Sequence, residues 1–303
     1  MDGGKVLPNK GIRARGLALA VAAAALAAGW LLTGAAKPAH AEFEIQEAEV
    51  EKGEVEIEYR GAYHWGVFDV GPGQAGVDAL DNEEEPGLRQ SYEVEVQLGI
   101  TDWWLLAVTH GFDQALGDDL RLTAVELETQ FVLISRKGDG VGLAIQGGYQ
   151  AALNHGDENG SPNEIAFGPI VELAKGPLLL TLNPLFNDQR GKFADQEGLG
   201  FEYGWQAKYS LNSRWGVGVE MFGEIEDLAN AGSFGDQTHS IGPTIFINFG
   251  GDDGDAGEAK ADDADDDKES QKSTEFQMNV GVQFGLTELA SDAALKVQGA
   301  LQF

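Results

Sequence analysis

Apolar and polar residues alternate along most of the chain with a period of two, which is the pattern of strands that have one apolar and one polar face. In residues 54–65, for example, Val55 and Ile57 alternate with Glu56 and Glu58. Beyond residue 41, no apolar run approaches the roughly 20 residues that a membrane helix needs. The pattern therefore predicts an all-β chain.

The alternation recurs in about twelve segments, which we interpret as strands. These segments are residues 54–65, 92–100, 103–112, 120–133, 141–153, 164–173, 178–186, 199–211, 215–225, 239–249, 274–286 and 293–303. Because single strands of a membrane barrel give weak signals, roughly 10 to 14 strands are compatible with the pattern. The segment 120–133 changes phase near Ala124, which indicates a β-bulge.

The connections between these segments alternate in length. Short links at residues 101–102, 135–140, 174–177 and 212–214 interleave with longer ones at 66–90, 113–119, 154–163, 187–198 and 227–238. Bacterial outer-membrane barrels alternate short periplasmic turns with long extracellular loops in this way. The chain is therefore predicted to form an antiparallel transmembrane β-barrel. One long link, 250–273, breaks the rule, so it is either a periplasmic insertion or a sign that the strand count is off by one.

The first 41 residues have the features of a signal peptide. Four basic residues precede an apolar run over residues 16–32, and the run is followed by the small-residue triplet Ala39-His40-Ala41. A membrane anchor fits less well, because the segment ends in a processing site instead of a stop-transfer cluster. We expect cleavage after Ala41, with residues 42–303 forming the outer-membrane barrel domain.

The last predicted strand ends in an aromatic residue. Its apolar positions are Leu295, Val297, Leu301 and the terminal Phe303, with Gly299 in the same alternation. This pattern resembles the C-terminal signature of bacterial outer-membrane β-barrel proteins of the porin-like class. The resemblance implies a location in the outer membrane, contact with its lipid, and recognition of Phe303 as an assembly signal by the barrel assembly machinery. The signature carries no catalytic residues.

The charge balance narrows the classes of partner. Without residues 1–41, 15 Lys and Arg face 49 Asp and Glu, a net charge of −34. Such a charge opposes nucleic-acid binding and disfavours anionic ligands, so cations are the expected partners. The chain has no cysteine, so it has no disulfide framework, thiolate metal site or thiol nucleophile.

If the apolar faces contact lipid, the opposite faces line the lumen. The acidic residues expected there are Glu56, Glu58, Glu93, Glu95, Glu126, Glu128, Glu202 and Glu220. The basic residues expected there are Arg60, Arg121, Lys208 and Lys296. An excess of carboxylates in a pore attracts cations and repels anions. Alternatively the same groups pack as a polar plug, because about twelve strands lies between barrels filled by side chains and barrels that hold wide channels.

The residues give little support for chemistry beyond this. The histidines after residue 41 lie in separate segments, without metal-binding spacing, and no nucleophile elbow occurs, so we expect no enzyme, catalytic residue, cofactor or defined metal site. Residues 250–273 hold ten Asp and Glu against three Lys and no core-forming residue, which predicts a disordered acidic insertion with weak divalent-cation binding at 252–269.

The function hypothesis is a passive, narrow outer-membrane channel with an acidic lumen for cations or small polar or aromatic solutes. The alternative is a closed structural or adhesive barrel that acts through its extracellular loops.

Overall fold

The computed structural model describes residues 43–67, 87–114, 119–153, 161–194, 196–250 and 274–303. The signal peptide predicted at residues 1–41, nearly all of the acidic insertion predicted at 250–273 and its expected divalent-cation site lie outside these residues. Among the described residues, no helix is long and apolar enough to cross a membrane.

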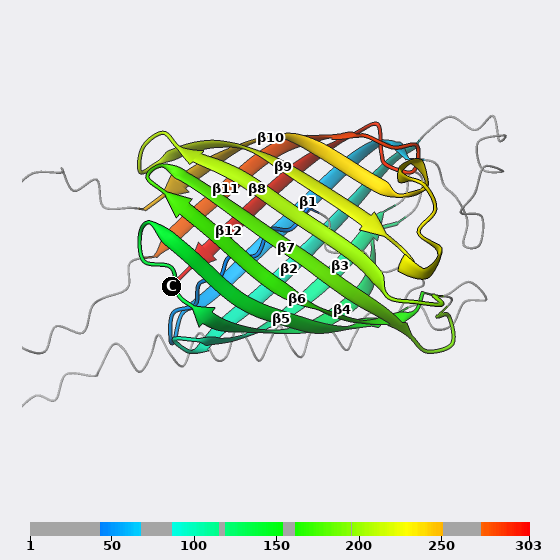
Figure 1. The fold of residues 1–303 in the computed structure, drawn as a ribbon, viewed down its shortest axis with the longest axis horizontal. Helices are drawn as coiled ribbons and strands as arrows, with labels where there is room; N and C mark the ends of the chain where they lie inside the picture. Colours follow the sequence, from blue (N-terminus) through cyan, green and yellow to red (C-terminus); the bar gives the residue numbers. More distant parts are fainter. Residues whose placement is uncertain (1–42, 68–86, 115–118, 154–160, 195, 251–273) are drawn as a thin grey trace, which may run out of the picture.

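Twelve antiparallel strands form one closed barrel (Figure 1). They are β1 (Val55–Val67), β2 (Gly87–Thr101), β3 (Trp104–Gln114), β4 (Arg121–Ile134), β5 (Gly140–Ala152), β6 (Asn163–Lys175), β7 (Leu178–Arg190), β8 (Gly200–Ser210), β9 (Trp215–Ile225), β10 (Thr238–Phe249), β11 (Glu275–Gly285) and β12 (Ala293–Gln302). Two short 3-10 helices, η2 (Leu228–Asn230) and η3 (Phe234–Asp236), lie between β9 and β10.

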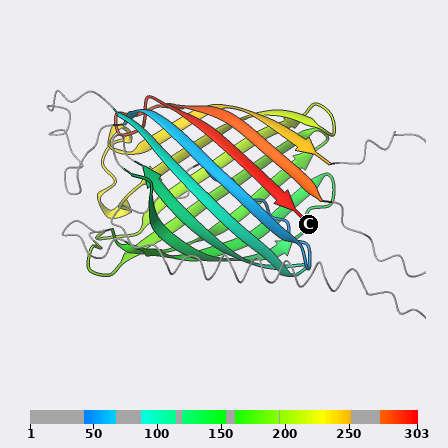
Figure 2. The ribbon, with the colours of Figure 1, turned by 180° about the vertical axis from the view of Figure 1, so that it is seen from behind.

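Each strand pairs with its neighbours in sequence, and β12 returns to pair with β1 from Glu56↔Gln302 to Trp65↔Ala293 (Figure 2). Outside this ladder, the N–H groups of Val55 and Phe303 each donate to the other's carbonyl, at 3.1 and 3.0 Å. Closure pairs the backbone groups of every strand and leaves no sheet edge, as a structure surrounded by lipid requires. The predicted fold class and the strand count of about twelve are confirmed.

Some strands are longer than the apolar alternation alone predicts. β2 begins at Gly87 instead of residue 92, and β7 continues to Arg190 instead of residue 186. The extra residues of β7 are polar but stay in the ladder, since Asn187 and Arg190 pair with Ala166 and Asn163. Backbone pairing therefore continues past the point where the apolar pattern ends.

The β-bulge expected near Ala124 is present. Gly111 pairs with Ala124 while Phe112 pairs with Leu122, which leaves Thr123 as the extra residue. The Thr123 hydroxyl donates to the Gly111 carbonyl at 3.1 Å, and the side chain is buried. The bulge shifts the phase of β4, as the sequence pattern indicated.

The barrel has two different ends. We call the end that contains the C-terminus the terminal end; the short links after β2, β4, β6 and β8 lie there, and the other end is the loop end. The link between β10 and β11 also leaves from the terminal end, next to the paired residues Phe249 and Phe276. The strand count therefore stands, and the long link between β10 and β11 joins strand ends on this side of the barrel.

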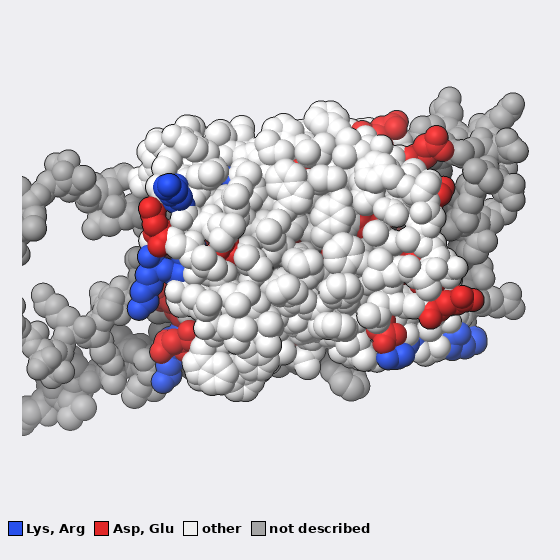
Figure 3. Space-filling view, in the orientation of Figure 1, with Lys and Arg blue, Asp and Glu red and all other residues white. Residues whose placement is uncertain are grey.

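The outer surface is an apolar belt. Leu127, Val219 and Ile245 are among the large apolar side chains that it exposes, and Val219 is 40% exposed. On the face shown in Figure 3, charged side chains gather at the two ends of the barrel. Exposed aromatic residues mark both ends, with Trp103 at the terminal end and Trp65 at the loop end. This is the surface of a barrel that spans a membrane.

Candidate functional site

The described residues before β1, 43–54, run through the interior of the barrel. We call residues 43–54 the N-terminal segment. Its Ala48 is fully buried and packs with Val132, Ala144 and Ile170, which face inward from β4, β5 and β6. The interior is otherwise polar, so this small apolar cluster fixes the middle of the segment against one wall.

Wall side chains hold the backbone of the segment. The Gln46 N–H donates to Asn183 Oδ1 at 2.6 Å, and Asn183 Nδ2 donates to the Gln46 carbonyl at 3.0 Å. On the same side of the barrel, the Glu47 carbonyl accepts from Gln130 at 2.9 Å and the Ala48 N–H donates to Glu172 at 3.1 Å. Side chains of the wall therefore satisfy main-chain groups of the segment that would be paired with a neighbouring strand in a sheet.

The segment also contacts the opposite wall. The Phe43 carbonyl accepts from Gln298 of β12 at 3.2 Å, and the Phe43 ring lies 5.6 Å from the ring of His64 on β1. Because β12 and β1 lie across the barrel from β6 and β7 in the strand order, the segment crosses the interior.

Two glycines allow the backbone of the segment to approach the wall. A Cβ atom on Gly99 would lie 2.0 Å from the Glu51 carbonyl oxygen, and one on Gly204 would lie 2.8 Å from Ile45 Cδ1 and 3.0 Å from the Glu44 carbonyl oxygen. Any larger residue at Gly99 would displace main chain. The wall is therefore shaped to accept the segment.

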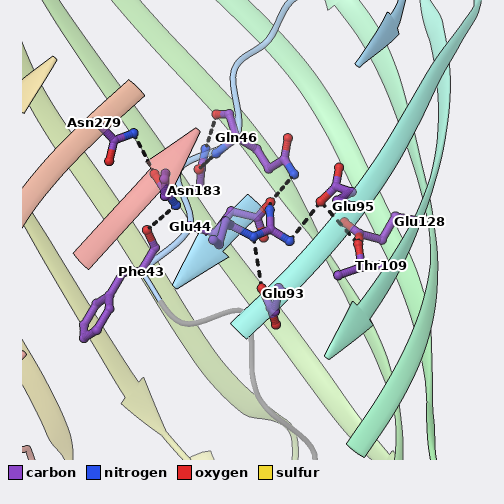
Figure 4. Close-up of polar contacts among 11 residues, drawn as sticks. Phe43, Glu44, Gln46, Glu93, Glu95, Thr109, Glu128, Asn183 and Asn279 are labelled. Atoms are coloured by element: carbon purple, nitrogen blue, oxygen red, sulfur yellow. Dashed lines mark hydrogen bonds and ion pairs between the residues drawn. The ribbon is translucent and has the colours of Figure 1, made fainter. Parts of the chain in front are cut away.

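Arg60 joins the segment to the wall of β2 through Glu44, Glu93 and Glu95, which are labelled in Figure 4. Its guanidinium lies 3.0 Å from Glu93 and 2.9 Å from Glu95, and it also pairs with Glu44 of the segment. Arg60 is 3% exposed. One buried cation therefore contacts three carboxylates, which leaves local negative charge in the interior.

A second buried pair lies on the other side of β1. Lys296 Nζ is 2.8 Å from Glu220 Oε2, which also accepts from the Thr244 hydroxyl at 2.7 Å. Both charged side chains are 1% exposed. Breaking such a pair would leave an uncompensated buried charge, so it stabilises one arrangement of β9 and β12.

Four of the predicted acidic residues have no basic side chain at ion-pair distance among the described residues: Glu56, Glu58, Glu126 and Glu128. Their hydrogen-bond partners are neutral where the structure shows one. Gln302 donates to Glu56, and the Thr109 hydroxyl lies 2.8 Å from Glu128 Oε1.

The other predicted site residues differ from one another in their contacts and exposure. Glu202 accepts from Asn187 at 2.6 Å, and Lys208 lies over the Phe246 ring at 4.8 Å. Arg121 is exposed at the start of β4, opposite Asp113.

The segment separates two cavities. The cavity near the terminal end is about 360 Å³ and is lined by Glu56, Glu58 and Gln302 together with residues of the segment. The cavity near the loop end is about 310 Å³ and is lined by Glu126 and Glu128, among others. Gln46 borders both cavities. The candidate functional site is therefore the interior of the barrel, which is rich in Glu side chains and is divided by the N-terminal segment.

The sequence pattern did not predict that the N-terminal segment lies inside the barrel, and it did not single out the amides that hold it, chiefly Gln46, Gln130, Asn183 and Gln298. Amides on inward faces were the one available signal, but they do not show what they bind. Among the described residues, no group of three or more His, Asp or Glu side chains is placed to hold a metal ion.

Comparison with known proteins identifies the architecture. No family model and no curated protein sequence matches the chain. Among solved structures, an outer membrane channel from Pseudomonas putida F1 matches with a TM-score of 0.52 at 9% identity, over 88% of this chain and 100% of that chain. The fold is that of an outer-membrane β-barrel. With its apolar belt, it assigns the protein to the bacterial outer membrane.

Looser matches have different functions. The KdgM porin in complex with disordered oligogalacturonate has a TM-score of 0.44 at 8% identity, over 82% of this chain and 98% of that chain. Outer membrane phospholipase A from Escherichia coli has a TM-score of 0.36 at 10% identity, over 88% of this chain and 94% of that chain. Because one fold can support many functions, the function has to be argued from the interior.

Proposed function

We propose that the protein is a passive, narrow outer-membrane channel whose acidic interior favours cations and small polar solutes over anions. The observation that carries the proposal is a set of four carboxyl groups that have no basic side chain at ion-pair distance among the described residues: Glu56 and Glu58 at the terminal-end cavity, and Glu126 and Glu128 at the loop-end cavity. Carboxyl groups thus line the cavities on both sides of the N-terminal segment. A solute entering from either end meets carboxylates, which attract counter-ions and repel co-ions.

The N-terminal segment sets the width of the path in this proposal. It continues into the barrel wall at Val55, and inside the barrel its described contacts are non-covalent. A shift of the segment away from Asn183 and Glu172 would join the two cavities without breaking any strand pairing. The segment therefore acts as an internal constriction that narrows the channel.

The rival function is a closed structural or adhesive barrel, and the same segment favours it. Ala48 is fully buried and five main-chain groups of residues 43–48 are hydrogen-bonded to the wall, so a permanently seated segment would seal the barrel. In that case the loops at the loop end would carry the function. Neither function uses catalytic residues, and the non-enzymatic assignment is part of the proposal. Recognition of Phe303 by the barrel assembly machinery also stays a prediction.

Planar-bilayer recording separates the two functions. The wild-type protein and a variant that lacks residues 43–50 are reconstituted and their KCl conductance is compared. The channel proposal expects small unitary currents from the wild type and larger ones from the deletion variant, since the constriction is gone. Absence of current from the wild type, together with large currents from the deletion variant, would show a sealed barrel. Absence of current from both folded proteins would also refute the channel.

A further inference from the structure

The loop-end cavity has two chemically different walls. Glu126 and Glu128 line it from β4, next to Gln146 and Gln150 of β5. Phe222 of β9 and Ala294 of β12 line it from strands on the other side of the barrel, together with Leu289. The same side also carries Glu224 and Ser240, so the carboxyl groups of β4 face a mixed surface with an apolar patch, which we call the apolar wall.

Neither Glu126 nor Glu128 has a basic side chain at ion-pair distance among the described residues. Glu128 accepts a hydrogen bond from the neutral Thr109 hydroxyl at 2.8 Å. Charged side chains in a protein interior are normally paired, so these two carboxylates are suited to an incoming cation.

The apolar wall is built around two aromatic rings. Phe43 of the N-terminal segment and Phe222 meet edge to face, with ring centroids 5.2 Å apart at 70°. Rings in this arrangement offer an apolar surface to the body of a ligand, while the chain's own Lys296 Nζ lies over the Phe222 ring at 5.2 Å from its centroid. A hydrated metal ion would make no use of such a wall, whereas an organic cation would.

Buried amides in the same cavity point independently to a ligand. Gln283 is 1% exposed and lines the cavity, and within the described part of the chain neither its Oε1 nor its Nε2 atom has a hydrogen-bond partner. Gln150 is 6% exposed and its Nε2 atom is also without a partner. Buried amides are almost always hydrogen-bonded in native proteins. These side chains therefore have capacity for a polar group of a bound molecule.

We propose that the loop-end cavity binds small organic amines, with the ammonium group at Glu126 and Glu128 and an apolar body against Phe43 and Phe222. The cavity, at about 310 Å³, is at the small end of the roughly 300–1,000 Å³ that is usual for ligand pockets, which suits a compact molecule. The inference rests on the proposed channel function in that it names a solute class for the same interior, but the binding itself does not require transport.

Binding of four matched probes to the detergent-solubilised protein, measured by calorimetry, tests the proposal. The probes are 2-phenylethylamine, the neutral 2-phenylethanol, the anionic phenylacetate, and ethylamine, which has the ammonium group but no aromatic body. We expect 2-phenylethylamine to bind most tightly and phenylacetate to bind least. Equal affinities for the amine, the alcohol and the anion would overturn the proposal, as would an absence of binding by the amine. Tighter binding of the alcohol would instead assign the cavity to neutral hydroxylated solutes.

Two double variants locate the site. Glu126→Gln/Glu128→Gln should weaken amine binding by about tenfold or more, because charge-assisted hydrogen bonds are about twice as strong as neutral ones. Glu197→Gln/Glu288→Gln removes the same charge from exposed positions outside the cavity and should leave the affinity within about twofold of wild type, since exposed charges are screened. Equal losses in both variants would overturn the assignment. If the first variant fails to fold, the four probes on the wild type still decide.

The channel proposal is tested separately, by measuring KCl conductance in the absence of amine. A conducting protein that does not discriminate among the probes would refute the amine site and leave the channel proposal intact. A protein that binds the amine but does not conduct would refute the channel and leave the binding site.

Discussion

Replacing Asn183 by Leu removes two hydrogen bonds that hold the N-terminal segment, at 2.6 and 3.0 Å, while keeping a side chain of similar size. A hydrogen bond between neutral groups contributes roughly 0.5–1.5 kcal/mol net, so the segment should lose about 1–3 kcal/mol of docking free energy. That loss corresponds to an increase of about 5- to 150-fold in the population with the segment undocked.

A single thiol reports this population. The natural chain has no cysteine, and Ala48 is fully buried under the segment's contacts. In an Ala48→Cys background, alkylation requires the segment to leave the wall. When the segment returns to the wall faster than the thiol reacts, the alkylation rate is proportional to the undocked population. Asn183→Leu should therefore raise the alkylation rate by about 5- to 150-fold, the factor estimated from the loss of two hydrogen bonds.

Asn187→Leu is the matched control. Asn187 is on the same strand and face and is 1% exposed, but it bonds Glu202 and Gln196 instead of the segment. Its replacement should leave the Ala48→Cys alkylation rate unchanged. The reasoning fails if Asn183→Leu leaves the rate unchanged, or if both Leu variants raise it equally.

Three further predictions concern the wall, the insertion and a loop. Val219→Arg places a charge in the apolar belt and should reduce the free energy of unfolding in bilayers by about 2–4 kcal/mol, whereas Gln97→Arg, on the interior face, should be tolerated; equal stabilities would show that the faces are assigned wrongly. Deleting residues 254–267 should leave heat-resistant electrophoretic mobility intact, because the acidic run has no residues that form a core; loss of that mobility would mean the insertion is structural. The pKa of Asp227 lies below its ordinary value of 3.8, because Asn230 and the N–H groups of Ala229 and Glu197 donate to its carboxylate. Its contribution to loop stability should be present above the unfolded pKa and disappear as pH falls through the lower folded pKa; an NMR titration with a midpoint at or above 3.8 would contradict this.

The barrel was predictable because lipid imposes a strict alternation on its strands. Val94 and Val96 face outward while Glu93 and Glu95 face inward, and the same rule fixes the register of each neighbouring strand. Once that register is known, Arg60 lies directly opposite Glu93, so part of its ion-pair cluster follows as well.

The N-terminal segment was not predictable in the same way. Phe43 and Ile45 alternate with Glu44 and Gln46, which is the same local pattern as a strand of the wall. The segment differs because its main chain is bonded by side chains of distant strands, at Asn183 and Glu172, and no local pattern encodes such contacts. For the same reason, the two cavities that the segment separates could not be predicted from the sequence.

The reversal potential under a KCl gradient tests the central claim most directly. The wild type is compared with a variant in which Glu56, Glu58, Glu126 and Glu128 are all replaced by Gln. These carboxylates lack a basic partner among the described residues, so their neutralisation leaves the Arg60 and Lys296 pairs intact. The account predicts a cation-selective potential for the wild type that moves toward zero in the variant. A conducting variant with the wild-type cation selectivity would contradict it.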